Sequence, residues 1–483
     1  MNTYIRLSRL IIAVWCVVAS SPLAAESKLV TYEAPEGPLL NDAFKVEVRV
    51  PGKSWRQVPT YLVKVDEVRQ AQHQPMNASM ASFDMEGRVE VRVTPRSTKL
   101  KSARIRPLSY GIQPSRKGGS FTFFLDKPSN LSVEVNGDIF HNLHLFANPV
   151  MTETPDKNDP NVVYFGPGIH TFPDKAYKVP SGKTVYVDGG AVLRGQLLIE
   201  DVRDVRVIGR GQVEHTIKMG IHIARSKNVL VEGLFTTQCA TGGSDSVTIR
   251  NVKSISYYGW GDGMNVFASS HVLFDRVFCR NSDDCTTVYA TRKGFSGDAR
   301  NITMQHSTLW ADVAHPIFIG LHGDAEQSNV IENLTYTDID ILDHNEMQVD
   351  YQGCLAINAG DNNVVRNVRF DNIRVEDFRH GQLVNLRIFF NKKYCMAPGA
   401  VIENVLFKDI KYSGANAELS IIAGYNEQRK VRNICFENLV INGKVIHDTM
   451  PSKPAWFKTS DMSGFFVGEH VENLRFVTSE LSR

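Results

Sequence analysis

The chain contains Asn333-Leu334-Thr335-Tyr336, Asn367-Val368-Arg369-Phe370 and Asn404-Val405-Leu406-Phe407, three copies of one phrase in which a polar residue precedes alternating apolar residues. The other seven copies are Asp204-Val205-Arg206-Val207, Asn228-Val229-Leu230-Val231, Ser246-Val247-Thr248-Ile249, His271-Val272-Leu273-Phe274, Asn301-Ile302-Thr303-Met304, Asn433-Ile434-Cys435-Phe436 and Asn473-Leu474-Arg475-Phe476. Successive copies lie 18 to 40 residues apart, and no segment between them has the period of a helix. Strands repeated in this way bury their apolar side chains only by stacking on one another. The repeat therefore predicts an all-β solenoid, a right-handed parallel β-helix with strands about 4.8 Å apart and asparagine ladders at its turns.

A β-propeller is the alternative architecture for repeated strands. Its blades need four strands in roughly 40 residues at regular intervals, and the spacing here varies too much for that. We therefore expect one solenoid over residues 161–478, in which the strands at Val272 and Ile302 are parallel neighbours.

Segments before the repeat indicate a second domain. Phe44-Lys45-Val46-Glu47-Val48-Arg49-Val50 and Val89-Glu90-Val91-Arg92-Val93 alternate apolar and polar residues, which is typical of antiparallel strands. A further strand ends at the turn-forming pair Asn136-Gly137. The polar, Pro-containing run around residues 152–160 is the candidate linker. We therefore expect a β-sandwich at residues 26–155, ahead of the β-helix.

The first 25 residues have the pattern of an export signal. Arg6 and Arg9 precede the apolar run of residues 10–19, and small residues ending in Ala24-Ala25 follow. The apolar run is about half as long as a bilayer span requires, so no membrane span is expected. The pattern predicts a signal peptide at residues 1–25 and a secreted or periplasmic protein.

The composition limits the function classes. The chain has 483 residues, of which 42% are hydrophobic and 22% charged, as in ordinary globular proteins. With 54 Lys and Arg against 52 Asp and Glu, it lacks the charge excess of a nucleic-acid binder. Six cysteines follow the signal without a C-x-x-C pair; some could form disulfides after export, and a zinc site is not expected. We expect no metal, no cofactor and a monomer.

Three aspartates form the candidate catalytic group. Asp262, within Gly261-Asp262-Gly263, precedes the pair Asp283 and Asp284 by one short coil of the predicted helix. Stacking would bring the three carboxyl groups onto one wall, where like charges raise one another's pKa. A protonated and an ionised carboxyl group together are what glycoside hydrolysis requires.

Two other interpretations of these aspartates remain open. Asp-Gly and Asn-Asp pairs are common in turns, so the residues could be structural turn formers. Clustered carboxylates also suit calcium.

The motifs resemble a known clan of enzymes. Gly261-Asp262-Gly263, followed one coil later by Asn281-Ser282-Asp283-Asp284-Cys285, is similar to the clan that contains the family 28 polygalacturonases and family 49 dextranases. The phrases at residues 164–170 and 185–195 are similar to the clan's first coil. The resemblance spans residues 163–476, and a β-sandwich ahead of the helix is closer to family 49.

The resemblance implies a role for each aspartate. Asp283 matches the general acid, and Asp262 and Asp284 match the carboxylates that hold and deprotonate the attacking water. Enzymes of this clan invert the anomeric carbon. Two motifs depart from the polygalacturonase pattern, because its Gly-His-Gly loop is matched only by Gly320-Leu321-His322-Gly323 and its basic uronate-binding strand only by Asn385-Leu386-Arg387-Ile388. Both departures argue against an acidic pectin substrate.

Further side chains near these motifs are candidates for contact with the substrate. They are His315, His322, Trp260, Trp310, Tyr289, Lys293 and Arg387. The histidines could equally form hydrogen bonds within loops, and the tryptophans could equally pack in a core.

Together these features predict an inverting glycoside hydrolase that cleaves α-linkages of a polysaccharide, first of all a dextran-like α-glucan. The alternatives are a polygalacturonase-like hydrolase of pectin, a β-helical polysaccharide lyase with calcium as partner, and a carbohydrate-binding β-helix without catalysis.

Overall fold

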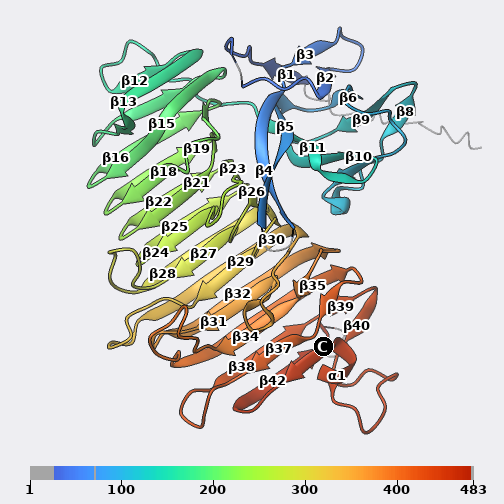
Figure 1. Ribbon diagram of the computed structural model, residues 1–483, viewed down its shortest axis with the longest axis vertical. Helices are drawn as coiled ribbons and strands as arrows, with labels where there is room; N and C mark the ends of the chain where they lie inside the picture. Colours follow the sequence, from blue (N-terminus) through green and yellow to red (C-terminus); the bar gives the residue numbers. More distant parts are fainter. Residues whose placement is uncertain (1–26, 38, 70–71, 480–483) are drawn as a thin grey trace, which may run out of the picture.

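The computed structural model describes residues 27–37, 39–69 and 72–479 and is built almost entirely of strands (Figure 1). The predicted signal peptide lies outside the described residues. A sheet of 29 strands runs from β12 to β42, and strands two to four apart along the chain pair in parallel. None of the helices in the described part is long and apolar enough to cross a membrane. The predicted parallel β-helix is thus confirmed, and Val272 lies opposite Ile302 in a parallel pair.

The ten phrases form one column of strands along the helix. Its members are β16 (Arg203–Gly209), β19 (Lys227–Glu232), β22 (Asp245–Arg250), β25 (Ser270–Asp275), β28 (Ala299–Ala311), β30 (Val330–Asp343), β32 (Val364–Glu376), β35 (Val401–Ser413), β38 (Val431–Glu437) and β42 (Val471–Val477). The first residue of every phrase has a left-handed backbone, with φ between 53° and 59°. Asparagine tolerates this conformation well, which explains its recurrence.

A second column carries the cleft described below. It consists of β15 (Ala191–Glu200), β18 (Met219–Ala224), β21 (Gln238–Gly242), β24 (Met264–Phe267), β27 (Thr286–Tyr289), β29 (Ile317–Gly320), β31 (Leu355–Ala359), β34 (Val384–Ile388), β37 (Ser420–Ala423) and β41 (Phe465–Val467). The remaining elements of the solenoid are β12 (Val162–Phe165), β13 (Gly168–Lys178), β14 (Thr184–Val187), β17 (Gln212–Val213), β20 (Phe235–Thr236), β23 (Lys253–Ile255), β26 (Phe278–Asn281), β33 (Gly381–Gln382), β36 (Ala417–Glu418), β39 (Leu439–Ile441), β40 (Lys444–Ile446) and α1 (Thr459–Ser463).

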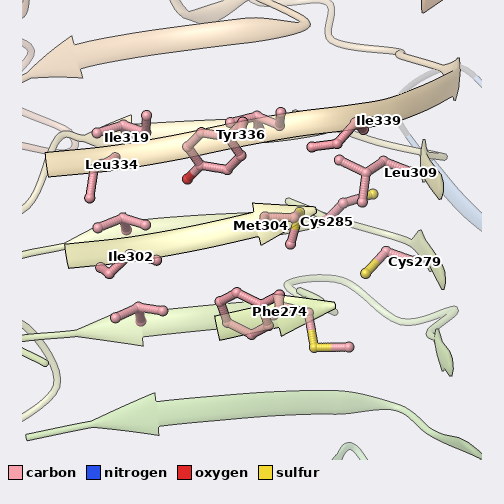
Figure 2. Close-up of a cluster of buried hydrophobic side chains, with 14 of the residues drawn as sticks. Phe274, Cys279, Cys285, Ile302, Met304, Leu309, Ile319, Leu334, Tyr336 and Ile339 are labelled. Carbon is pink, nitrogen blue, oxygen red and sulfur yellow. The ribbon is translucent and has the colours of Figure 1, made fainter. Parts of the chain in front are cut away.

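The interior of the helix is filled by stacked apolar side chains (Figure 2). The fourth residue of successive phrases forms an aromatic stack, in which Tyr336, Phe370, Phe407 and Phe436 lie with ring centroids 4.5 to 5.4 Å apart. All six cysteines after the signal are free, so none of the disulfides that the sequence left open is formed.

The N-terminal strands form two sheets packed face to face around a shared core. They are β1 (Lys28–Thr31), β2 (Phe44–Arg49), β3 (Arg56–Val58), β4 (Tyr61–Arg69), β5 (Gln72–Glu86), β6 (Val89–Pro95), β7 (Ala103–Arg106), β8 (Ser115–Lys117), β9 (Ser120–Leu125), β10 (Ser129–Val135) and β11 (Asp138–Pro149). Pairing is not wholly antiparallel as expected, since β11 runs parallel to β5. The chain between those two strands crosses to the other sheet, and parallel neighbours require such a long connection.

The sandwich is fixed to the flank of the β-helix. Phe146 and Val63 pack with Phe278 in one buried cluster. Beside it Arg280 forms a fully buried ion pair with Asp312 at 2.9 Å. The coils that carry the aspartates are therefore covered by the sandwich on one side, at β26. Their β24 and β27 strands, on another side, stay uncovered.

Candidate active site

Asp262 and the pair Asp283 and Asp284 occupy corresponding places on successive coils, directly before β24 and β27. These strands pair in parallel with their first residues opposite each other. The Gly263 N–H donates to the main-chain oxygen of Asp284 at 2.8 Å. A Cβ atom at residue 263 would lie 2.4 Å from the main-chain oxygen of Cys285, so only glycine fits this close approach. The aspartates of the two coils therefore lie on one wall.

The aspartates open into a cleft of about 880 Å³ on the outer face of the column. It is lined by Met219, His222, Arg225, Gln238, Ala240, Trp260, Asp262, Phe267, Asp283, Asp284, Tyr289, Arg292, Lys293, Phe295, Val313, Ala314, His322, Glu346, Gln348, Tyr351, Lys393 and Tyr394. Aromatic rings, cations and carboxyl groups together are suited to bind and polarise a sugar chain.

Asp284 is paired with a buried histidine. His315 Nδ1 lies 2.6 Å from Asp284 Oδ1, and its Nε2 contacts the main-chain oxygen of Tyr351. Both partners accept hydrogen bonds, so both ring nitrogens carry a proton and the imidazole is a cation. Burial lowers the pKa of His315, yet the Asp284 carboxylate outweighs it and the net shift is upward. The pair is therefore a buried ion pair directly behind the cleft.

The pKa of Asp283 is shifted strongly upward. Burial, and then the charges of Asp262 and Asp284, raise its pKa well above the usual range of a carboxyl group. Its Oδ1 accepts the N–H of Asp284 at 2.9 Å. Asp283 is therefore a carboxyl group suited to keep a proton and to donate it within the cleft.

Asp262 titrates close to neutrality. Burial and the charge of Asp284 raise its pKa to about 7, against the lowering effect of a hydrogen bond from Asn265. That bond, from Asn265 Nδ2 to Asp262 Oδ2, is 2.7 Å long. Asn265 also donates to Thr287 Oγ1 at 2.8 Å, so it holds Asp262 against the next coil. The site therefore contains two carboxyl groups with a raised pKa, Asp262 and Asp283, beside the histidine-paired Asp284.

Several candidates from the sequence line this cleft. Trp260 is 87% exposed at its rim, and Lys293 is exposed near Asp262. The Tyr289 hydroxyl lies 3.4 Å from Asp284 Oδ2. The ring of His322 meets that of Tyr289 edge to face at 4.9 Å. Burial, together with Arg292 and Lys293, lowers the pKa of His322 to about 3, so it is neutral at physiological pH.

Three candidates do not line the cleft. His315 is fully buried, so it positions Asp284 and does not touch a substrate. Arg387 lies three strands further along the column, where it pairs with Asp350 at 2.9 Å. Trp310 is fully buried under Arg280, whose guanidinium carbon lies 4.0 Å from the ring centroid, because the sandwich covers that side of the coil.

The cleft also contains residues that sequence reasoning missed. They include Arg225, Arg292, Glu346, Gln348, Tyr351, Lys393 and Tyr394. Most lie in the long connections before β31 and after β34, which have no periodic pattern. Arg292 adjoins Lys293 and could have been found from that basic pair.

Within the described residues, no group of three or more His, Cys, Asp or Glu side chains has the geometry to hold a metal ion.

Comparisons with known proteins agree with this architecture. The model of the family described as glycosyl hydrolases family 28 matches residues 203–453, just over half of the chain. Dex49A from Penicillium minioluteum is similar over 92% of this chain and 96% of its own, at 12% identity and a TM-score of 0.56. The family 28 exopolygalacturonase of Yersinia enterocolitica is similar over 80% and 96%, at 11% identity and a TM-score of 0.48. No curated protein sequence matches the chain. The likeness to Dex49A extends to the whole layout of sandwich and β-helix.

Proposed function

The chain belongs to glycosyl hydrolase family 28 and is a glycoside hydrolase, and from this premise we propose that it cleaves α-glycosidic bonds of a polysaccharide with inversion of the anomeric carbon. One observation carries the proposal: Asp283, whose pKa burial and the charges of Asp262 and Asp284 raise well above the usual range, lies in an open cleft beside Asp284, which pairs with His315. An acid and a base held side by side at the same pH are what this hydrolysis needs.

In the proposed reaction Asp283 donates its proton to the glycosidic oxygen while the bond from that oxygen to the anomeric carbon breaks. A water held by Asp262 and Asp284 attacks the opposite face, forms the new C–O bond and gives one proton to a carboxylate. His315 positions Asp284 through the contact between its Nδ1 and Asp284 Oδ1. Exchange of one proton with solvent restores the starting state.

Two substrate classes are supported by different observations. The dextran-like α-glucan expected from the sequence rests on the layout of sandwich and β-helix. An acidic glycan rests on the cleft itself, where Arg292, Lys293 and Lys393 form no ion pair within the described residues. Arg225, by contrast, is bound to Glu200 and Asp201.

Unpaired cations in a cleft attract negative charge and cost desolvation when a neutral chain covers them. Because the cleft contacts the substrate and the layout does not, we place an acidic glycan such as a galacturonan first and the neutral glucan second.

A panel of polygalacturonate, dextran, pullulan and algal galactans tests the proposal. The expected result is release of reducing ends from one polysaccharide without ultraviolet-absorbing products, with the inverted anomer formed first as seen by NMR. Unsaturated products that vanish with chelator would instead identify a lyase. Binding of a glycan without any new reducing ends would refute catalysis.

We also propose that the chain is exported and acts as a secreted or periplasmic monomer. The support for export is the signal pattern of residues 1–25. N-terminal sequencing of the exported protein is expected to show cleavage after Ala24 or Ala25, and size-exclusion chromatography a single-chain mass. An intact N-terminus would contradict export by cleavage.

A further inference from the structure

Beyond the cleft, the column that carries the aspartates exposes a pair of aromatic side chains. Phe390 is 38% exposed and Tyr425 is 45% exposed, and their rings meet edge to face with centroids 6.4 Å apart. Each lies two residues after a strand, β34 or β37, and these strands pair in parallel (Figure 1). We call Phe390 and Tyr425 the distal platform.

The distal platform is continuous with the cleft. Phe390 belongs to the connection after β34, and the same connection contributes Lys393 and Tyr394 to the cleft. The ring of Tyr394 stacks on that of Tyr351, also a cleft residue, at 4.9 Å. A chain leaving the cleft along this connection would therefore pass from the Tyr351–Tyr394 pair toward the distal platform.

The spacing suits a polymer. β34 is the third strand after β27 along the column, and β37 is the fourth. At about 4.8 Å per strand, the platform lies about 14–19 Å along the axis from Asp283. Several sugar units of a polysaccharide span this distance, whereas a disaccharide does not.

The polar groups around the platform fit a sugar. Within the described residues, the Tyr425 hydroxyl has no hydrogen-bond partner. Arg387, on β34, is 26% exposed and pairs with Asp350, which is 77% exposed. A pyranose ring presents an apolar C–H face, which an aromatic ring covers, and hydroxyl groups at its edge, which such polar groups bind.

We propose that the distal platform is a binding subsite for the polysaccharide chain whose bond is cleaved at Asp283, with pyranose rings stacked on Phe390 and Tyr425 and a hydroxyl group bound at Arg387. The inference rests on the proposed function for the identity of the ligand. It assigns Arg387 to this remote position, outside the central cleft.

The test compares Asp283→Asn with the triple variant that also carries Phe390→Ala and Tyr425→Ala. Binding of the panel polysaccharides to these proteins is measured by affinity electrophoresis, which needs no turnover. Loss of the platform is expected to weaken polymer binding about tenfold. Phe124→Ala in the sandwich, where Phe124 is 42% exposed, is the matched control, and the platform variant is expected to keep the Tm of its parent.

A second readout uses the active enzyme. The double variant Phe390→Ala and Tyr425→Ala is expected to raise KM for the polymer about tenfold relative to KM for a disaccharide-length substrate. Unchanged polymer binding in an enzyme that cleaves the polymer would overturn the platform alone. Platform-dependent binding in a protein that cleaves nothing would support the platform and refute the hydrolase reaction.

Discussion

Two columns of polar side chains run along the β-helix one coil at a time, the asparagines of the phrase turns and the aspartates of the cleft. In the turn column, each Asn Nδ2 donates to the Oδ1 of the residue one coil below, at 2.8 to 3.2 Å from Asn333 to Asn473. An amide both donates and accepts, so the ladder satisfies itself. Ionised carboxyl groups only accept, and burial together with the charges of the neighbouring aspartates raises the pKa of Asp262 and Asp283. The same coil spacing thus lets stacked amides stabilise the fold, whereas it brings carboxyl groups close enough to raise one another's pKa.

The comparison also bears on the idea that the aspartates are turn formers. Every phrase turn has a positive φ, whereas Asp262, Asp283 and Asp284 do not. Asp284 instead accepts hydrogen bonds from the buried His315. Nothing in the local backbone requires an aspartate at these three positions, which leaves their chemistry as the reason for them.

The largest expected effect comes from replacing an aspartate of the cleft by asparagine, the residue of the turn column. Asp283→Asn keeps the shape of the side chain and removes the proton that is donated. We expect turnover of the polysaccharide to fall by roughly a hundred- to ten-thousand-fold, the usual contribution of general acid catalysis. The measurement is the rate of reducing-end release at saturating substrate.

An activated aryl glycoside separates the roles of the three aspartates. Its leaving group needs no proton, so Asp283→Asn should regain activity on it, whereas Asp262→Asn and Asp284→Asn should stay impaired because they act on the water. Equal activity ratios for the three variants would remove the acid assignment. Full activity of Asp283→Asn on the polysaccharide would remove the catalytic interpretation altogether.

Asp283→Asn should also stabilise the folded protein, and the pH dependence of the folding stability shows why. Folding raises the pKa of Asp283, so between the unfolded pKa of about 3.9 and the higher folded value the native state binds the extra proton. The contribution of Asp283 to the free energy of unfolding is therefore fully present below about pH 4 and decreases as the pH rises. We expect Asp283→Asn to have a higher Tm than the parent at pH 7 and an equal Tm near pH 4. A lower Tm at pH 7 would show that the carboxyl group is not strained.

Much of this contrast was accessible from the sequence. The phrase repeat defined the coils, and the distance from Asp262 to Asp284 placed both on one wall. The same arithmetic could have placed His315, a candidate substrate contact, beside Asp284, because the next phrase begins 30 residues later and the Cys285 N–H donates to the main-chain oxygen of His315. Motif resemblance favoured His322 instead, which lies beyond β29 and stays neutral.

Other features could not be predicted. Glu346 and Lys393 lie in insertions whose path depends on tertiary packing and leaves no periodic trace. For Trp310 the sequence left sugar contact and core packing open, because nothing in its strand shows that the sandwich covers it. That Arg292, Lys293 and Lys393 share one cleft likewise emerges only from the fold, because Lys393 comes from a distant coil. This is why the substrate charge expected from the motifs differs from the one that the cleft favours.

The smallest expected effect is the reciprocal swap, an acid placed in the amide ladder. Asn367 donates to Asn333 Oδ1 and accepts from Asn404 Nδ2, each at 3.2 Å. Asn367→Asp keeps the shape and a tolerance for positive φ, but the ionised group has no proton for Asn333, so two acceptors face each other. We expect a loss of about 0.5–1 kcal/mol in unfolding free energy at pH 7, recovered below about pH 4 where the new carboxyl group is protonated, and unchanged turnover.

Asp204→Asn is the matched control, because Asp204 only accepts, from Asn228 at 2.7 Å, and an amide there keeps that bond. Chemical denaturation at pH 4 and pH 7 measures both. If Asn367→Asp is as stable as the parent at pH 7, the ladder bonds do not contribute to stability, and the asparagines recur only for their left-handed backbone.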